Sequence, residues 1–448
     1  MKNPVLRNLF FYVVIGCLAL LPLVSNADDS IKTLSLKDTI EIAIDANLNL
    51  RQSREEVRAA EENRKASITR FFPTLSSSYD YTHRNKELTQ ELTGIGPSPD
   101  FIVRPDDQYT FVTSFNQPIF NGFTLINQYK VADLGLDVAE FGEKVTRQDV
   151  ILDAKNAFYS ALKAEKLMEV ARQRVIQIAA QKDVAENFYE VGMSPLNDLL
   201  EAQASLANAR QDFIVAQNNL AIAKSQFNLV LRRPVNEPVQ IEDILDYSPF
   251  VYDFDYCLKT AKENRLEITV ADLEVEIAEK EVALAKKDYY PSVNLRGNYT
   301  RTGDDYKAKG GEGISDSTSW EIQAVAEWEF WQWGRTHFGV REKLHRLSQA
   351  QYRRSQILDN IELEVKTSFL RTKESEKNII TVEKAIEQAK ENFRINQERF
   401  KEQVATTTDV LDAQTLLSNT LTNYFNALYD FKISKATLFR SMGQEVME

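Results

Sequence analysis

Acidic side chains near two breaks in a helical pattern are the residues of this sequence whose types and spacing could do chemistry. Asp409 and Asp412 stand three apart at the start of a predicted helix, so their carboxylates project from nearly the same face of its first turn. Asn197 and Asp198 hold the corresponding place after the earlier break. Carboxylates on one face attract cations, but near a helix N-terminus they also complement the helix dipole. The sequence leaves both roles open.

The other polar residues do not form the constellation of an enzyme or a metal site. The three histidines, His83, His337 and His345, are not clustered at ligand spacing. The chain has no glycine-rich phosphate loop after a strand and no recognisable pair of nucleophile and base. Its 66 acidic and 54 basic residues give a net charge of −12, which disfavours nucleic acid as a partner. We expect no catalytic residue, no cofactor and no bound metal.

The N-terminal segment, residues 1–27, has the pattern of a secretory signal peptide. Lys2 and Arg7 precede an apolar run, and residues 25–27 offer small side chains at a cleavage point. A lipoprotein signal is the alternative, because Cys17 ends a lipobox-like sequence and would then be acylated. Beyond this segment no run approaches the roughly 18 to 20 apolar residues of a membrane helix. Any insertion into a membrane must therefore use strands.

A stretch of alternating residues, 319–330, has the pattern of a membrane-spanning strand. Its apolar face begins and ends with bulky aromatic rings and holds alanines between them; this face consists of Trp320, Ile322, Ala324, Ala326, Trp328 and Phe330. The other face carries Glu321, Gln323, Glu327 and Glu329. Trp320 and Trp328 would lie roughly 20 Å apart along a tilted strand, near the spacing of two aromatic girdles. A strand of a soluble sheet is the alternative. We expect Trp320, Trp328 and Phe330 to face lipid and the acidic row to face a water-filled lumen.

The sequence repeats itself once along its length. Residues 43–73 correspond without a gap to 261–291, and Gly122 corresponds to Gly334. This duplication predicts two structural units, 28–253 and 254–448, each with a helix, a strand, a polar loop, a second strand and a long helical hairpin.

Each unit is expected to supply two strands. They are 74–83 and 108–118 in the first unit, with Tyr79 and Phe111 facing lipid, and 291–301 and 319–331 in the second. Four strands cannot close a membrane barrel, which needs about eight, and an open edge cannot face lipid. Several copies of the chain must therefore contribute to one pore.

The helical patterns predict hairpins far longer than a globular domain needs. The first runs from residue 122 to about 189 and would be about 100 Å long. The returning helix carries large residues seven apart, interleaved with alanines seven apart: Leu199, Leu206, Phe213, Leu220 and Phe227 with Ala202, Ala209, Ala216 and Ala223. This heptad pattern is typical of left-handed, nearly parallel helix packing. The expected fold is mainly α with a β-barrel portion.

The order of these motifs resembles the TolC-like outer membrane efflux proteins across nearly the whole chain. The resemblance rests on the duplicated junctions Phe71-Phe72-Pro73 and Tyr289-Tyr290-Pro291, on Gly122 and Gly334, and on the sequences after the two helix breaks, 198–203 and 409–414. It implies a homotrimer with a twelve-stranded barrel in outer membrane lipid and a periplasmic helical tunnel. It also implies two partners, a periplasmic adaptor protein and an inner membrane transporter.

The resemblance also implies roles for the two turns between long helices. Being farthest from the membrane, they would be the adaptor-docking tips, formed by Gly192, Met193, Ser194, Ala405 and Thr406; a plain helix break is the alternative. Matching aspartates in the family line the periplasmic constriction, so Asp409 and Asp412 would form the gate, with Asn197 and Asp198 hydrogen-bonded across to hold the helices together. The second turn departs from the family pattern, because residues 405–408 contain no glycine.

The function expected from this resemblance is passive conduction as the exit duct of a tripartite efflux pump. A type I secretion system that exports whole proteins would use the same kind of duct. A non-conducting envelope spacer or receptor is a third reading, although a row of ionisable groups inside the barrel favours a pore. The sequence does not identify the cargo, because the inner membrane pump would select it.

Overall fold

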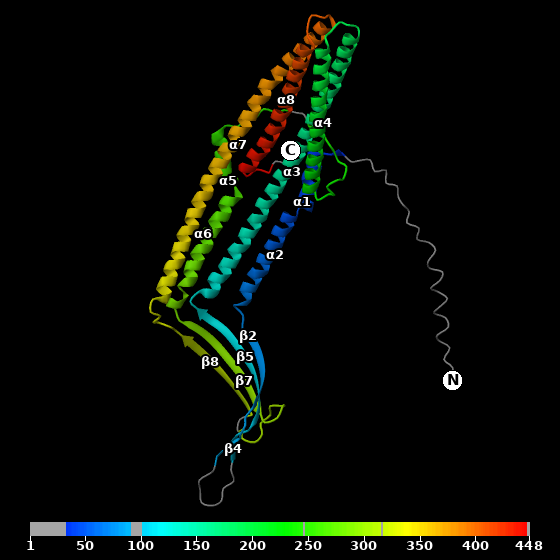
Figure 1. Cartoon of the computed structure of the whole chain (residues 1–448). Coiled ribbons are helices and arrows are strands. Elements are labelled where there is room, and N and C mark those ends of the chain that lie inside the picture. Colours follow the sequence, from blue (N-terminus) through cyan, green and yellow to red (C-terminus); the bar gives the residue numbers. More distant parts are fainter. Residues whose placement is uncertain (1–32, 91–100, 245–246, 315–316, 446–448) are drawn as a thin grey trace, which may run out of the picture.

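The structure, a computed structural model, describes residues 33–90, 101–244, 247–314 and 317–445. The expected signal peptide and the alternative lipidation site at Cys17 lie outside these residues. The described chain forms a long rod of helices with a four-stranded sheet at one end (Figure 1). This architecture agrees with the expected class, mainly α with a membrane sheet.

The helices are dominated by two pairs of equal length. α3 and α7 have 67 residues each, and α4 and α8 have 35 residues each. The helices are α1 Leu36–Ala46, α2 Leu48–Thr69, α3 Thr124–Glu190, α4 Leu196–Val230, α5 Phe254–Asn264, α6 Leu266–Ala285, the short 3₁₀ helix η1 Lys287–Tyr289, α7 Arg335–Lys401 and α8 Thr407–Ser441. At 1.5 Å per residue α3 and α7 are each about 100 Å long. None of the helices in the described residues combines the length and the apolar character that crossing a membrane requires.

The strands follow the same twofold plan. They are β1 Thr33–Leu34, β2 Thr74–His83, β3 Leu88–Gln90, β4 Phe101–Arg104, β5 Asp107–Asn121, β6 Gln240–Ile241, β7 Ser292–Gly303 and β8 Thr318–Glu327. β2, β5, β7 and β8 form one antiparallel sheet in that order, and β3 and β4 form a short hairpin beyond it. Apart from the β3–β4 hairpin and η1, the elements therefore occur twice in the same order, while the division at residues 253 and 254 stays a prediction.

Some expected elements differ from those of the structure. The single helix expected before the first strand is two helices, α1 and α2, because Asn47 adopts extended backbone and its side chain accepts a hydrogen bond from the Leu50 amide, capping α2. The last strand was expected to reach residue 331 but ends at Glu327, opposite Ser292. β7 begins at Ser292 and η1 precedes it, so no strand backbone remains to pair with Trp328 and the residues after it.

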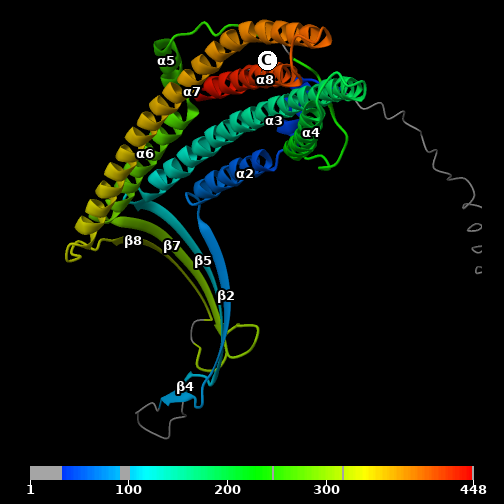
Figure 2. The same cartoon turned by 45° about the horizontal axis from the view of Figure 1, so that its top comes forward.

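The strand register separates the two faces of the sheet. Residues directly opposite each other in an antiparallel pair share a face. Tyr79 pairs with Phe111 of β5. Trp320 pairs with Tyr299, and Tyr299 pairs with Thr113, which lies on the same face of β5 as Phe111. Glu321 pairs with Asn298 on the other face, which is polar on all four strands. The sheet curves along its length as it leaves the helices (Figure 2).

The sheet has an unpaired edge on either side. β2 and β8 each pair with one neighbour only among the described strands, so one row of backbone N–H and C=O groups on each is without a ladder partner. A protomer alone therefore leaves both edges of its sheet open.

α3 is the central helix of the rod. It packs against α1, α2, α4, α6 and α8. The main core lies near its middle, where Phe158, Phe227 and Tyr429 are fully buried. Ala202 and Ala209 of the α4 heptad pattern are also fully buried, as expected for a seam in which alanines admit the neighbouring helix.

A buried ionic network ties four helices together where α8 ends. Arg440 of α8 donates to Asp149 of α3 and to Glu267 of α6, at 2.8 and 2.9 Å. Arg265 donates to Glu267 at 2.9 Å and to the Ser441 carbonyl at 3.2 Å, and it contacts α7 through Glu364. Burial raises the pKa of Glu267, but the two guanidinium groups outweigh burial and hold the pKa below its usual value.

The two faces of the sheet should respond differently to a new charge. Ala324 is on the apolar face and Gln323 on the polar face. We expect Ala324→Arg to cost about 2 to 4 kcal/mol if it lies near the bilayer midplane, because lipid cannot solvate the guanidinium. Gln323→Arg should change folding little. Heat-modifiability gels of the membrane-inserted oligomer measure the effect, and equal responses of the two variants would show that the assignment of faces is wrong.

Candidate functional site: the helical tips and the polar face of the sheet

The two turns between the long helices lie side by side at the end of the rod far from the sheet (Figure 1). Residues 191–195 join α3 to α4, and residues 402–406 join α7 to α8. The Phe188 and Phe400 rings are 5.4 Å apart, and the Gln403 amide lies 3.8 Å from the sulfur of Met193. The expected docking residues are therefore gathered on one surface, although their docking role stays a prediction.

Both turns have the same backbone conformation despite different sequences. Gly192 has φ +77° and donates to the Tyr189 carbonyl, and the next amide donates to Phe188. In the second turn Gln403 has φ +61° and donates to the Phe400 carbonyl, and the next amide donates to Arg399. Glutamine thus holds the left-handed position that glycine adopts more easily. The sequence indicated a glycine-free turn at residues 405–408 but did not indicate that Gln403 adopts the left-handed conformation.

Asp409 has a structural role at the start of α8. Its carboxylate accepts hydrogen bonds from the Thr406 amide and hydroxyl, both at 2.8 Å, and the Asp409 amide donates back to the Thr406 hydroxyl at 3.2 Å. This capping box lowers the pKa of Asp409, first through the backbone bond and then through the hydroxyl. Asp412 lies one turn later, is exposed, and makes no hydrogen bond or ion pair among the described residues. The helix-capping role left open by the sequence therefore applies to Asp409.

In the described protomer the side chains of Asn197 and Asp198 make no hydrogen bond across the tip, so their expected role in holding the helices together stays a prediction for the oligomer. Among the described residues, the hydrogen bond from α8 to α4 at this level is the one that the Thr408 hydroxyl donates to Glu201, at 2.9 Å. Glu201 lies one turn beyond Asn197 on the same face of α4, and its longer side chain reaches the first turn of α8. Asn197 is exposed and Asp198 is half-buried.

The polar face of the sheet carries a connected row of hydrogen-bonding groups. Asn298 donates to Glu321 at 2.9 Å, and Gln323 donates to the other oxygen of Glu321 at 3.1 Å. Arg296 lies 3.8 Å from Glu327. Where the row meets the helices, a cavity of about 370 Å³ is lined by residues that include Asp288, Glu327 and Glu329. This face suits contact with water rather than with lipid.

The opposite face is apolar and exposed in the protomer. Trp320 is 74% exposed, Tyr79 51% and Phe330 78%. Trp328 and Phe330 lie beyond the end of β8, with ring centroids 6.2 Å apart. They can therefore lie at the membrane surface where the sheet meets the helices, whereas Trp320, Tyr79 and Phe111 are part of the sheet itself.

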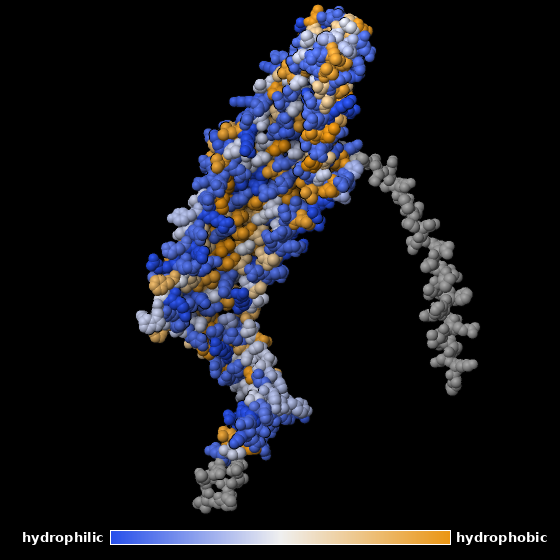
Figure 3. Space-filling model, viewed as in Figure 1, coloured by the Kyte–Doolittle hydropathy of each residue, from blue (hydrophilic) through white to orange (hydrophobic). Residues whose placement is uncertain are grey.

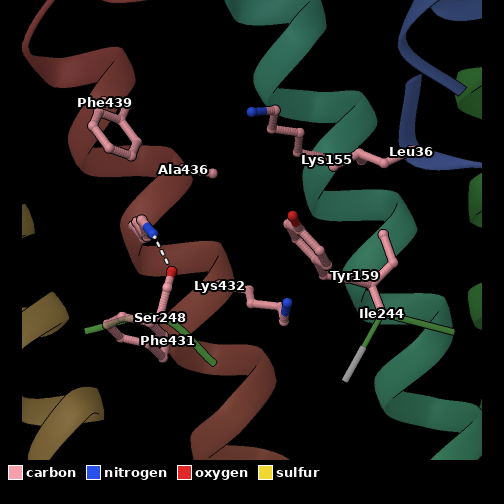
Figure 4. A pocket seen from close by; sticks show the side chains of 10 residues that line it. Leu36, Lys155, Tyr159, Ile244, Ser248, Phe431, Lys432, Ala436 and Phe439 are labelled. Carbon is pink, nitrogen blue, oxygen red and sulfur yellow. Dashed lines mark hydrogen bonds between the residues drawn. The ribbon is translucent and has the colours of Figure 1, made fainter. Parts of the chain in front are cut away.

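A second cavity lies between α3 and α8, and Figure 4 shows the side chains that line it. It measures about 320 Å³ and is lined by residues of α1, α3, α8 and the connector before α5. Lys435 of α8 donates to Ser248 at 3.1 Å and so holds the connector against the helices. Lys155 of α3 is buried, which lowers its pKa to about 8, with the charge of Lys435 adding to the effect. Among the described residues no group of three or more His, Cys, Asp or Glu is placed to hold a metal.

Comparison with known proteins identifies the family. The model of the outer membrane efflux protein family matches residues 39–231 and 257–444, which together span most of the chain. The chain belongs to the outer membrane efflux protein family. Its place in the outer membrane and its role as an efflux channel follow from this membership, and the two matched segments correspond to the two repeats.

Individual relatives of this efflux protein are distant but extend over most of its length. It is 23% identical to the outer membrane protein TolC of Vibrio cholerae, covering 78% of this chain and 81% of the relative. It is also 23% identical to the alkaline protease secretion protein AprF of Pseudomonas aeruginosa, covering 90% and 83%. The crystal structure of the outer membrane protein VceC of Vibrio cholerae superimposes with a TM-score of 0.78 at 17% identity, covering 91% and 96%.

Hydrogen exchange should distinguish the role of Asp409 from that of Asp412. We expect Asp409→Ala to speed amide exchange at residues 406–410, because it removes the capping box, and Asp412→Ala to leave exchange there unchanged. Folding lowers the pKa of Asp409. The stabilisation of the folded state by this carboxylate is therefore complete above the unfolded-state pKa, and it is lost as pH falls through the folded-state pKa. The difference in amide exchange rate at residues 406–410 between Asp409→Ala and wild type, corrected for intrinsic exchange rates, should therefore become smaller in acid. Equal effects of the two variants would contradict this assignment.

Proposed function

We propose that this protein is the outer membrane exit duct of a tripartite system and conducts cargo passively from the periplasm to the exterior. The observation that carries the proposal is the pairing of one polar and one apolar face on a sheet with two open edges, joined to a rod about 100 Å long. Such a sheet becomes a lumen when copies close it, and the rod extends that lumen into the periplasm.

A homotrimer closes the sheet with twelve strands. The helices support the same assembly, because apolar side chains remain exposed on the protomer at heptad-related positions of α4. Leu200 is 53% exposed, Ile214 64%, Ile222 48% and Leu229 57%. Figure 3 shows apolar residues running along the rod and gathered at its tip. A series of exposed apolar side chains along one helix of a soluble segment is typical of an interface.

The tips are proposed to dock a periplasmic adaptor protein, and through it an inner membrane transporter that supplies the energy. Apolar side chains are exposed at the end of the rod, where Val191 is 67% exposed, Met193 54% and Val404 61%. Gly192, Ser194, Ala405 and Thr406 complete this surface. Small and apolar residues on two adjoining helical hairpins suit docking of a partner's helices.

The gate is proposed to lie at the same end. Asp412 is exposed on α8, and in a trimer it would form a ring of three carboxylates, with Asp409 one turn nearer the tip. Asn197 and Asp198 would line the corresponding turn of α4. Rings of carboxylates attract cations and repel anions at a narrow entrance.

The cargo class follows from neither the fold nor the comparisons. One relative is named for secretion of a protease, whereas the family is named for efflux, so both kinds of transport are represented among proteins similar to this one. We propose the duct function common to both.

Conductance in planar bilayers tests the gate. We expect Asp412→Ala to lower cation selectivity and to weaken block by multivalent cations, with little change in oligomer stability. Asp412 is the better residue to replace, because Asp409 also caps α8. Replacing both aspartates should lower cation selectivity further. Wild-type selectivity in Asp412→Ala would place the gate elsewhere, and a purified oligomer that never conducts, even with its tip opened, would favour a non-conducting spacer.

Site-specific crosslinking tests the docking surface. Photoreactive residues at Met193, Ser194 or Thr406 should capture the adaptor in cells, because these positions lie on the exposed end of the rod. Ser355, exposed on the side of α7, serves as the matched position away from the tip. Capture from Ser355 but from none of the tip positions would reject docking at the tips.

A further inference from the structure

Positive charge is concentrated where the helices join the sheet. Four ten-residue segments, 64–73, 122–131, 280–289 and 332–341, make up this level of the molecule, which we call the junction collar (Figure 1). These segments contain nine lysines and arginines and two acidic residues, a net charge of +7. The whole chain has a net charge of −12, so the rest of it carries −19. Glu329, just before the last segment, pairs with Arg335 and lowers the net charge of this level to +6 (+7 − 1), so the collar is still a basic belt on an acidic protein.

Most of these basic side chains are exposed. The exposed residues are Lys65, Arg70, Lys130, Lys286, Lys287, Arg335 and Arg341. Some of them have local partners: Arg335 pairs with Glu329 at 2.6 Å and Lys287 with Asp288 at 3.9 Å. Lys130, Lys286 and Arg341 make no ion pair within the described part of the chain.

Exposed aromatic rings occupy the same level. Phe72 is 61% exposed, Phe123 48%, Tyr290 47% and Trp333 86%, so each of the four junctions presents at least one ring. The apolar face of β8 leads directly into this belt through Trp328 and Phe330. Aromatic rings in this position mark the boundary between hydrocarbon and headgroups. The basic residues among and beyond them then lie at the depth of lipid phosphates.

We propose that the junction collar binds the headgroups of anionic glycerophospholipids in the periplasmic leaflet and prefers them to zwitterionic lipids. The preference follows from charge complementarity, because a cluster of lysines and arginines beside a membrane attracts anionic headgroups. The aromatic rings insert equally well among both kinds of lipid, so the basic residues provide the discrimination. This inference rests on the position of the sheet in the outer membrane and is independent of cargo, docking and gating.

The distribution of tryptophan allows a direct measurement. The chain has four tryptophans: Trp320 in β8, Trp328 and Trp331 in the four residues after it, and Trp333 in the collar segment. The purified full-length oligomer would be placed in nanodiscs containing equal mole fractions of brominated phosphatidylglycerol or brominated phosphatidylcholine. Bromine quenches tryptophan on contact, so the ratio of quenching by the two lipids reports the relative affinity of the collar.

We expect phosphatidylglycerol to be favoured about threefold or more at low salt, since lysine and arginine residues close to a membrane surface attract anionic headgroups. The ratio of quenching by the two lipids should fall towards one as the salt concentration rises, because ions screen exposed charges. The triple variant Lys130→Gln, Lys286→Gln, Arg341→Gln should lose most of the preference without breaking an ion pair of the described chain.

The matched control is Arg371→Gln, Lys377→Gln, Lys384→Gln. These residues are also exposed and lie on α7, beginning about 50 Å beyond its membrane end. This variant changes the net charge equally and should keep the wild-type preference. If the collar variant does not assemble, the salt dependence of the wild-type protein still tests the proposal.

Equal quenching by the two lipids in the wild-type protein would overturn the proposal. So would a preference that persists in the collar variant or in high salt. A collar variant that keeps the lipid preference but loses capture of a periplasmic protein would assign the basic belt to an acidic protein surface instead. A failure of conductance or of adaptor crosslinking would leave this result unaffected, so the two proposals fail separately.

Discussion

The unpaired backbone groups along β2 and β8 are the constraint on which the rest of the structure depends. A membrane offers no hydrogen-bond partner for an open strand edge, and each unsatisfied group costs several kcal/mol there. The sheet must therefore be completed by strands of other copies. Closure in turn requires one face of every strand to meet lipid and the other to meet a lumen, which is how Trp320 and Glu321 are placed on neighbouring positions of β8.

The helical rod meets a different requirement, because it must stay rigid over about 100 Å without a broad globular core. Its apolar core is distributed in separate clusters: the largest contains Phe158 and Phe227, a second lies among α5, α7 and α8, and a third lies nearer the tip around Ile178 of α3. Where the two repeats meet, the network around Arg440 and Arg265 joins helices of both. Buried charges are costly to desolvate unless they are paired; the two buried guanidinium groups are paired with carboxylates of neighbouring helices, although one nitrogen of Arg440 has no hydrogen-bond partner.

The two tips show how one backbone shape can be reached from different residues. Gly192 and Gln403 hold equivalent left-handed positions, and the following amides make equivalent hydrogen bonds. Asp409 illustrates that one residue can have both a structural and an electrostatic role, since its carboxylate caps α8 and still adds negative charge near the tip. Asp412 carries charge at the same end without a capping bond in the described chain.

Local periodicity in the sequence was enough to predict the long helices and the four membrane strands, because these patterns repeat every few residues and need no distant partner. The order and twofold repetition of motifs along the whole chain indicated the duplication and the family. Asn47 carried a local capping signal, but the continuous apolar pattern around it concealed the break between α1 and α2. The end of β8 at Glu327, the partnership of Thr408 with Glu201 and the network around Arg440 were decided by tertiary structure alone. Each depends on which distant backbone or side chain comes within hydrogen-bonding distance, and residue spacing along one segment contains no information about that.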